Sequence, residues 1–281
     1  MKTQYIPDLR IKTGILLFAL LCPGLVFCQT RSGQVLSSET KSGIAYVNVG
    51  IIGKNIGTVT NEYGNFTITL DKINNTDSLR FSMIGYESKS FLVSQFKEDS
   101  IKDVYLVPRS YYLTEVKVFS HRTHEIRLGT PVLSDALKSG FESNDLGSEM
   151  GIKVNARKQV VLKEININVA TCTFDSVVYR INIYQVVNKT EYKNILIEPI
   201  YISFSKDKID KVITLNLRKY SILIEGEVLI SLELFKDLGE GRLLFHTQYF
   251  TGITYHRKTS QGKWTEAPGA IGMYLYGQTT K

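Results

Sequence analysis

Five aromatic side chains near the end of the chain have types and spacing that predict ligand chemistry. They are Trp264, Tyr249, Tyr255, Tyr274 and Tyr276. Exposed aromatic rings stack on the apolar C–H faces of sugars, so these residues predict a glycan site. Aromatic residues are also ordinary core and cross-strand residues of β proteins, and the chain has 16 tyrosines and 13 phenylalanines. Trp264, Tyr249, Tyr255 and Tyr274 are the candidate ligand-binding residues, with a core role as the alternative for each.

Two places in the sequence offer ligands for a metal ion. His121 and His124 lie beside Glu125, and imidazole and carboxylate groups bind zinc, but the spacing is poor and a third distant ligand is lacking. Glu149, with carbonyl oxygens of nearby glycine-rich turns, offers the oxygen ligands that calcium prefers. One carboxylate does not define a site, so a structural calcium stays unassigned, and we predict no metal site and no cofactor.

Catalysis has weak support in the sequence. His246 and His256 would face each other if the chain folded back at Gly252, but no residue orients them. We find no nucleophile elbow, no paired carboxylates beside a predicted cleft and no glycine-rich phosphate loop. We therefore predict no catalytic residues and a protein that is not an enzyme. The alternative is a glycoside hydrolase, which would need two suitably spaced carboxylates.

The first 28 residues are typical of an export signal. Basic residues precede an apolar run at 14–21 that is too short to span a membrane, so we expect cleavage before Gln29 and no transmembrane span in the mature chain. The bulky Phe27 disfavours lipidation of Cys28, which stays open. Cys172 is then the remaining cysteine, which excludes an intramolecular disulfide, and we expect it to be a buried small hydrophobe.

The charge pattern argues against nucleic-acid binding. The formal net charge is +7, but the lysines and arginines are scattered among acidic residues. A nucleic-acid-binding surface would need a basic stripe interleaved with aromatic residues. We therefore predict no nucleic-acid partner.

Residues 29–107 have the spacing of a small β-sandwich. Short runs rich in Val, Ile, Phe and Tyr alternate with clusters of Gly, Asn, Asp and Ser. The predicted strands are Ser32–Ser37, Ala45–Ile51, Gly57–Thr60, Gly64–Leu70, Ser78–Met83, Lys89–Leu92 and Lys102–Leu106.

Residues 108–144 are predicted to be a linker or bridging segment, in which Ser134 would begin one short helix. Residues 145–281 are predicted to form a second, larger β domain of jelly-roll type. Its segments Glu164–Val169 and Arg180–Tyr184 alternate polar and apolar residues, which predicts one face in a core and one in water. These two segments lie within the predicted strand runs, which are 158–173, 176–187, 194–205, 211–217, 220–235, 242–255 and 271–276.

The first domain resembles a known family through four segments. These are Gly33-Gln34-Val35, the run Ala45–Val49, the run Gly57–Phe66 and the run Leu79–Tyr86. Together they resemble the carboxypeptidase-regulatory-like domain, a transthyretin-like seven-stranded sandwich common at the start of exported and outer-membrane proteins of Gram-negative bacteria. The resemblance covers about Ser32 to Leu106 and implies an accessory module without peptidase activity.

The second domain is similar at the level of pattern to jelly-roll modules of carbohydrate-binding and cell-surface proteins. The fold class is therefore all-β, with residues 1–28 as signal peptide, 29–107 and 145–281 as β-sandwiches and 108–144 between them. We expect an exported protein of a Gram-negative periplasm or cell surface, in which the first sandwich is a spacer or docking module and the second binds a glycan or an envelope protein. The alternative is a structural assembly factor that pairs through exposed strand edges.

Overall fold

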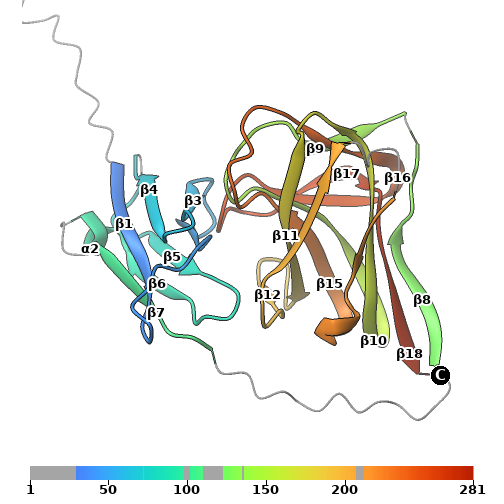
Figure 1. The fold of residues 1–281 in the computed structure, drawn as a ribbon, viewed down its shortest axis with the longest axis horizontal. Coiled ribbons are helices and arrows are strands. Elements are labelled where there is room, and N and C mark those ends of the chain that lie inside the picture. The colour runs from blue at the N-terminus through green and yellow to red at the C-terminus, as the bar shows by residue number, and fades with distance from the viewer. Residues whose placement is uncertain are drawn as a thin grey trace, which may run out of the picture.

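The computed structural model describes residues 30–280 except 72, 98–101, 110–122, 135 and 207–211. The predicted signal peptide, Cys28 and His121 lie outside the described residues. Figure 1 shows two β domains side by side, the first in blue to teal and the second in green to red. In the described part of the chain, no helix is long and apolar enough to cross a membrane.

The first domain is a sandwich of two small sheets, as predicted. Its elements are β1 (Thr30–Ser37), β2 (Asn48–Ile51), β3 (Gly57–Val59), β4 (Asn65–Thr69), β5 (Ser78–Ser82), β6 (Lys89–Leu92), α2 (Val93–Lys97) and β7 (Asp103–Leu106). One sheet has the order β4-β1-β7, with β7 parallel to β1, and the other has the order β3-β2-β5-β6. All seven predicted strands are present, and the short helix α2 was not predicted.

The core of the first domain follows from the alternation of its strands. In β4 the side chains of Phe66 and Ile68 point inward, while their neighbours are exposed. The ring of Phe66 lies 5.4 Å from that of Phe81 and 6.1 Å from that of Phe96, centroid to centroid. Aromatic packing of this kind joins both sheets to α2.

The second domain is built on one branched antiparallel sheet that curves around its own core. Its elements are β8 (Thr123–Thr130), β9 (Lys138–Phe141), β10 (Glu149–Cys172), β11 (Ser176–Val186), β12 (Tyr192–Asn194), β13 (Ile200–Ser205), β14 (Val212–Asn216), η3 (Arg218–Tyr220), β15 (Leu223–Glu233), β16 (Leu243–Arg257), β17 (Thr265–Ile271) and β18 (Met273–Thr280). The central path is β12-β11-β15-β10-β16-β17, and the other strands pair off it.

The 24-residue strand β10 organises this domain. It pairs with β15, β16, β18 and β14 along its length, with irregularities in register that let it bend between layers. The jelly-roll connectivity predicted for this domain is not confirmed.

Part of the predicted bridging segment belongs to the second domain. β8 pairs with β18 over its whole length, and β9 pairs with β16. The short helix expected to begin at Ser134 was wrong, since the backbone from Lys138 onward is the strand β9. The sequence there is compatible with a helix, but tertiary pairing decides the conformation of so short a run.

Several polar side chains of β10 and β11 are buried, contrary to the prediction from their sequence. The polar residues of Arg180–Tyr184 were expected in water, but Arg180, Asn182 and Tyr184 are all buried. Asn166 and Asn168 of β10 are buried as well. The apolar face of β11 packs into the domain core through Ile181 and Ile183. On its polar face, Arg180 bonds to the first domain, while Asn182 and Tyr184 bond to buried glutamates of their own domain.

The two domains approach each other closely at glycine residues. A Cβ atom on Gly50 would lie 2.2 Å from the carbonyl oxygen of Ser260, and one on Gly57 would lie 2.5 Å from the same atom. Gln261 adds a side-chain hydrogen bond of 2.8 Å to the hydroxyl of Ser82. Only residues without a side chain allow this backbone contact.

Candidate ligand-binding site at the domain interface

Four charged residues form a row across the face of the second domain that meets the first. Arg180 of β11 is opposite Glu233 of β15, Glu233 is opposite Glu149 of β10, and Glu149 is opposite Arg257 of β16. Opposite residues of neighbouring strands project from the same face of a sheet. The row therefore has the charge order plus, minus, minus, plus, and all four side chains are at most 9% exposed. We call it the charged row.

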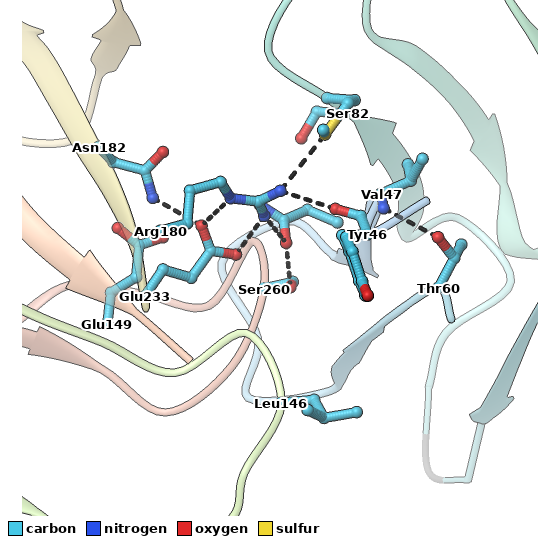
Figure 2. Close-up of polar contacts among 12 residues, drawn as sticks. Tyr46, Val47, Thr60, Ser82, Leu146, Glu149, Arg180, Asn182, Glu233 and Ser260 are labelled. Atoms are coloured by element: carbon cyan, nitrogen blue, oxygen red, sulfur yellow. Dashed lines mark hydrogen bonds and ion pairs between the residues drawn. The ribbon is translucent and has the colours of Figure 1, made fainter. Parts of the chain in front are cut away.

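The pair of Arg180 and Glu233 also joins the domains, as Figure 2 shows. Arg180 donates from Nε and Nη2 to the two carboxylate oxygens of Glu233, at 2.9 and 2.6 Å. Its Nη1 donates to the carbonyl oxygen of Tyr46 at 2.8 Å, and its Nη2 donates to Oδ1 of Asn48 at 3.1 Å. Ser260 donates to the same Asn48 oxygen at 2.9 Å. Nη1 also contacts Sδ of Met83 at 3.3 Å. One guanidinium thus binds a carboxylate of its own domain and three acceptors of the other.

The pair of Glu149 and Arg257 is held within the second domain. Arg257 donates from Nε to Glu149 at 2.9 Å, and its Nη2 donates to the same carboxylate oxygen. Glu149 also accepts hydrogen bonds from Ser231 at 2.6 Å and from the hydroxyl of Tyr184 at 3.1 Å. These donors occupy the oxygens of Glu149, the carboxylate that the sequence offered as a calcium ligand.

The two glutamates differ in their proton affinity. Burial would raise the pKa of Glu233, but the charge and hydrogen bonds of Arg180 outweigh burial and hold the pKa below its usual value. Burial raises the pKa of Glu149, and Arg257 opposes that rise only in part. The nearby charge of Glu233 raises the pKa of Glu149 further.

A cleft of about 790 Å³ opens between the domains, beside the two arginines of the charged row. From the first domain it is bordered by residues that include Arg80, Ser82 and Tyr86. Tyr192 and Trp264 border it from the second domain. Its size is that of a site for a small ligand.

Aromatic rings form the second-domain wall of the cleft. The ring of Trp264 lies 5.8 Å from that of Tyr192 and 6.0 Å from that of Tyr184, centroid to centroid. The guanidinium carbon of Arg257 lies 4.9 Å from the Trp264 centroid. This cation–π contact connects the charged row to the wall and fixes the orientation of the indole.

The four predicted ligand-binding residues are not gathered in one place. Trp264 borders the cleft, and Tyr255 belongs to the same apolar cluster but is 8% exposed and packs against Lys153. Tyr249 is 51% exposed beside Phe250, at an irregularity of β16. Tyr274 lies on β18 against Tyr276. Sequence reasoning missed the arginines and Tyr192, because residues of separate strands become neighbours only through long-range pairing.

The other chemical candidates lie apart. His246 and His256 are ten residues apart on the single strand β16, so the chain does not fold back at Gly252 to bring them face to face. His246 contacts the carbonyl oxygen of Ser134, and His256 contacts the hydroxyl of Thr265. His124 and Glu125 are exposed neighbours on β8.

Cys172 is half-buried rather than fully buried, and burial raises the pKa of its thiol. Within the described residues, no group of three His, Cys, Asp or Glu side chains is placed to hold a metal ion.

Comparison with known families identifies the first domain. Residues 31–118 match the family described as CarboxypepD_reg-like domain, so the chain carries this regulatory-like module on its first third. A search of curated proteins finds no match. Among solved structures, the chain is similar to the VP2 subviral particle of infectious bursal disease virus, at 10% identity over 90% of this chain and 81% of that one, with a TM-score of 0.12.

Proposed function

We propose that this protein is a non-catalytic, exported cell-envelope protein that binds a glycan in the cleft between its two domains. The first domain is the docking module that closes one side of the cleft, and the second supplies the aromatic wall. The single observation that carries the proposal is the partly buried Trp264, held by Tyr184, Tyr192 and Arg257 at the border of a cleft of about 790 Å³. Sugars bind to such oriented rings.

Binding is favoured over hydrolysis by the environment of the two buried glutamates. A glycoside hydrolase needs one carboxylic acid and one carboxylate beside the scissile bond. Glu149 and Glu233 are 1% and 0% exposed and are each paired with an arginine, and neither is among the residues that border the cleft. Within the described chain, the one carboxylate at the border is that of Glu191.

The test is glycan binding by the full chain. Trp264→Ala is compared with Tyr274→Ala, whose ring lies on β18 and does not border the cleft. We expect a panel of glycans to contain ligands that the natural chain and Tyr274→Ala bind alike. Trp264→Ala should bind these ligands at least about fivefold more weakly, since stacking of one ring contributes about 1 kcal/mol or more. Equal binding by both variants, or no binding at all, would contradict the proposal.

A second candidate function, assembly through strand edges, is favoured by β8. Within the described residues this eight-residue strand pairs only with β18, so its other edge is open to strand addition. Self-association of the full chain on gel filtration, removed by a proline at exposed Glu125, would support this function.

A further inference from the structure

We propose that the ligand of the cleft is an acidic saccharide, whose carboxylate, sulfate or phosphate group binds between Arg80 and Arg257 while a sugar ring packs on Trp264. This inference rests on the proposed function and adds the chemical class of the ligand. It follows from the charge of the cleft, from the environment of Arg80 and from the geometry of Arg257.

Cationic side chains dominate the border of the cleft. Beyond the two arginines of the charged row, which have their own glutamates, the border includes Arg80, Arg109, Lys189, Lys193 and Lys263. Glu191 is the one acidic residue at the border within the described chain. Like charges around a concave surface add their fields and attract anions.

Arg80 is a half-buried guanidinium among other cations. It lies on β5, and burial lowers its pKa, which the nearby charges of Arg257 and Arg109 lower further. Within the described chain its guanidinium donates one hydrogen bond, of 3.0 Å, to the uncharged hydroxyl of Ser88, and forms no ion pair. A guanidinium has five N–H donors, so Arg80 retains donors for a two-oxygen anion.

Arg257 offers a further donor next to the aromatic wall. Its Nε and Nη2 are used by Glu149 and Tyr184. In the part of the chain that the structure describes, no hydrogen bond involves its Nη1, although the residue borders the cleft. The guanidinium also contacts the Trp264 ring, so an anion at Arg257 lies within one sugar unit of the indole.

The charged row shows what these arginines bind when a carboxylate is provided. Arg180 takes both oxygens of Glu233 in a two-point contact. Arg80 has the same chemical group, and no acid among the described residues lies against it. An acid group on the ligand would supply the missing partner, and the planar fork of arginine would select it over a hydroxyl.

The experiment uses Trp264, which is the single tryptophan of the chain, as the reporter. The full chain is titrated with matched acidic and neutral saccharides, and indole fluorescence is recorded: oligogalacturonate against its methyl ester, dextran sulfate against dextran, and mannose 6-phosphate against mannose. We expect at least one acidic form to bind at least tenfold more tightly than its neutral counterpart. The preference should weaken as salt concentration rises.

Arg80→Gln tests the assignment, with Arg127→Gln on exposed β8 as the matched control. Arg80→Gln should lose about tenfold or more in affinity for the acidic form and leave binding of the neutral form unchanged, because a hydrogen bond to a charged group is worth about 1.5–3 kcal/mol. Arg80→Lys should be intermediate, and Arg127→Gln should match the natural chain.

Three contradicting outcomes are distinguishable. Equal binding of acidic and neutral forms by the natural chain, with binding to the glycan panel lost in Trp264→Ala when it is measured without the indole signal, would overturn the inference and leave the proposed glycan function standing. Binding of neither form in any of the three pairs would overturn both. Unchanged affinity in Arg80→Gln, despite a preference for acid, would overturn the assignment to this cleft.

Discussion

The two ion pairs of the charged row are made of the same residue types on adjacent strands, yet they have different surroundings. Arg180 directs its remaining donors to Tyr46 and Asn48, so its pair with Glu233 is closed within the protein. Both arginines border the cleft, but Arg257 directs the face of its guanidinium to Trp264. Neighbours, rather than residue type, decide that one pair holds the domains together and the other shapes a site.

The largest effect is expected from breaking the closed pair. Arg180→Met would leave the carboxylate of Glu233 buried without a counter-charge, so the free energy of unfolding should fall by about 3–5 kcal/mol. Urea unfolding measures the change, with Lys158→Met on the exposed part of β10 as control. Adding Glu233→Leu to Arg180→Met should recover much of the lost stability. If Arg180→Met lowered the free energy of unfolding by less than about 1 kcal/mol, the pair would not hold the domains together.

Breaking the pair beside the cleft should have a smaller effect. In Arg257→Met, Glu149 keeps its hydrogen bonds from Ser231 and Tyr184, and its raised pKa makes protonation easy. We expect a loss of about 1–3 kcal/mol in the free energy of unfolding. The fluorescence of Trp264 should change in the folded protein. A loss as large as that of Arg180→Met would remove the distinction between the pairs.

The pH dependence of stability should separate the two glutamates. The pKa of Glu233 is lowered in the folded protein, so its contribution is present above the ordinary glutamate pKa of about 4.3 and is lost as pH falls through the folded value. Glu149 has a raised pKa, so its contribution is present below about 4.3 and is lost as pH rises through the folded value. The free energy of unfolding should be measured from about pH 7 down to about pH 3. Its fall with decreasing pH should be less steep in Glu233→Gln than in the natural chain, and steeper in Glu149→Gln. Equal slopes would show that the two carboxylates are equivalent.

The smallest effect is expected outside both pairs. Tyr249→Ser removes a half-exposed ring that does not border the cleft. The free energy of unfolding should change by less than about 0.5 kcal/mol, and saccharide affinity should stay the same. Lost affinity in this variant would place the glycan at the irregularity of β16 instead.

Local patterns were enough to predict the strands of the first domain and most of those of the second, but not β8, β9 and β17. Residues such as Phe66 and Ile68 alternate with polar neighbours, and this period of two is a property of short segments. The same reasoning assigned the polar residues of β11 to water, because a sequence does not show what covers a sheet. Trp264 was found from its type alone. Arg80, Arg180 and Arg257 come from three segments far apart in the chain, and nothing in their local sequence marks them as neighbours.

The pairing of β8 with β18 also has a consequence for biogenesis. Thr130 pairs with Met273, so β8 cannot form its ladder until β18 has been synthesised. The first domain has all its strands before residue 107 and can fold without that delay. A chain truncated before β18 would leave β8 and the middle of β10 with unpaired edges, which are targets for proteases and sites of aggregation.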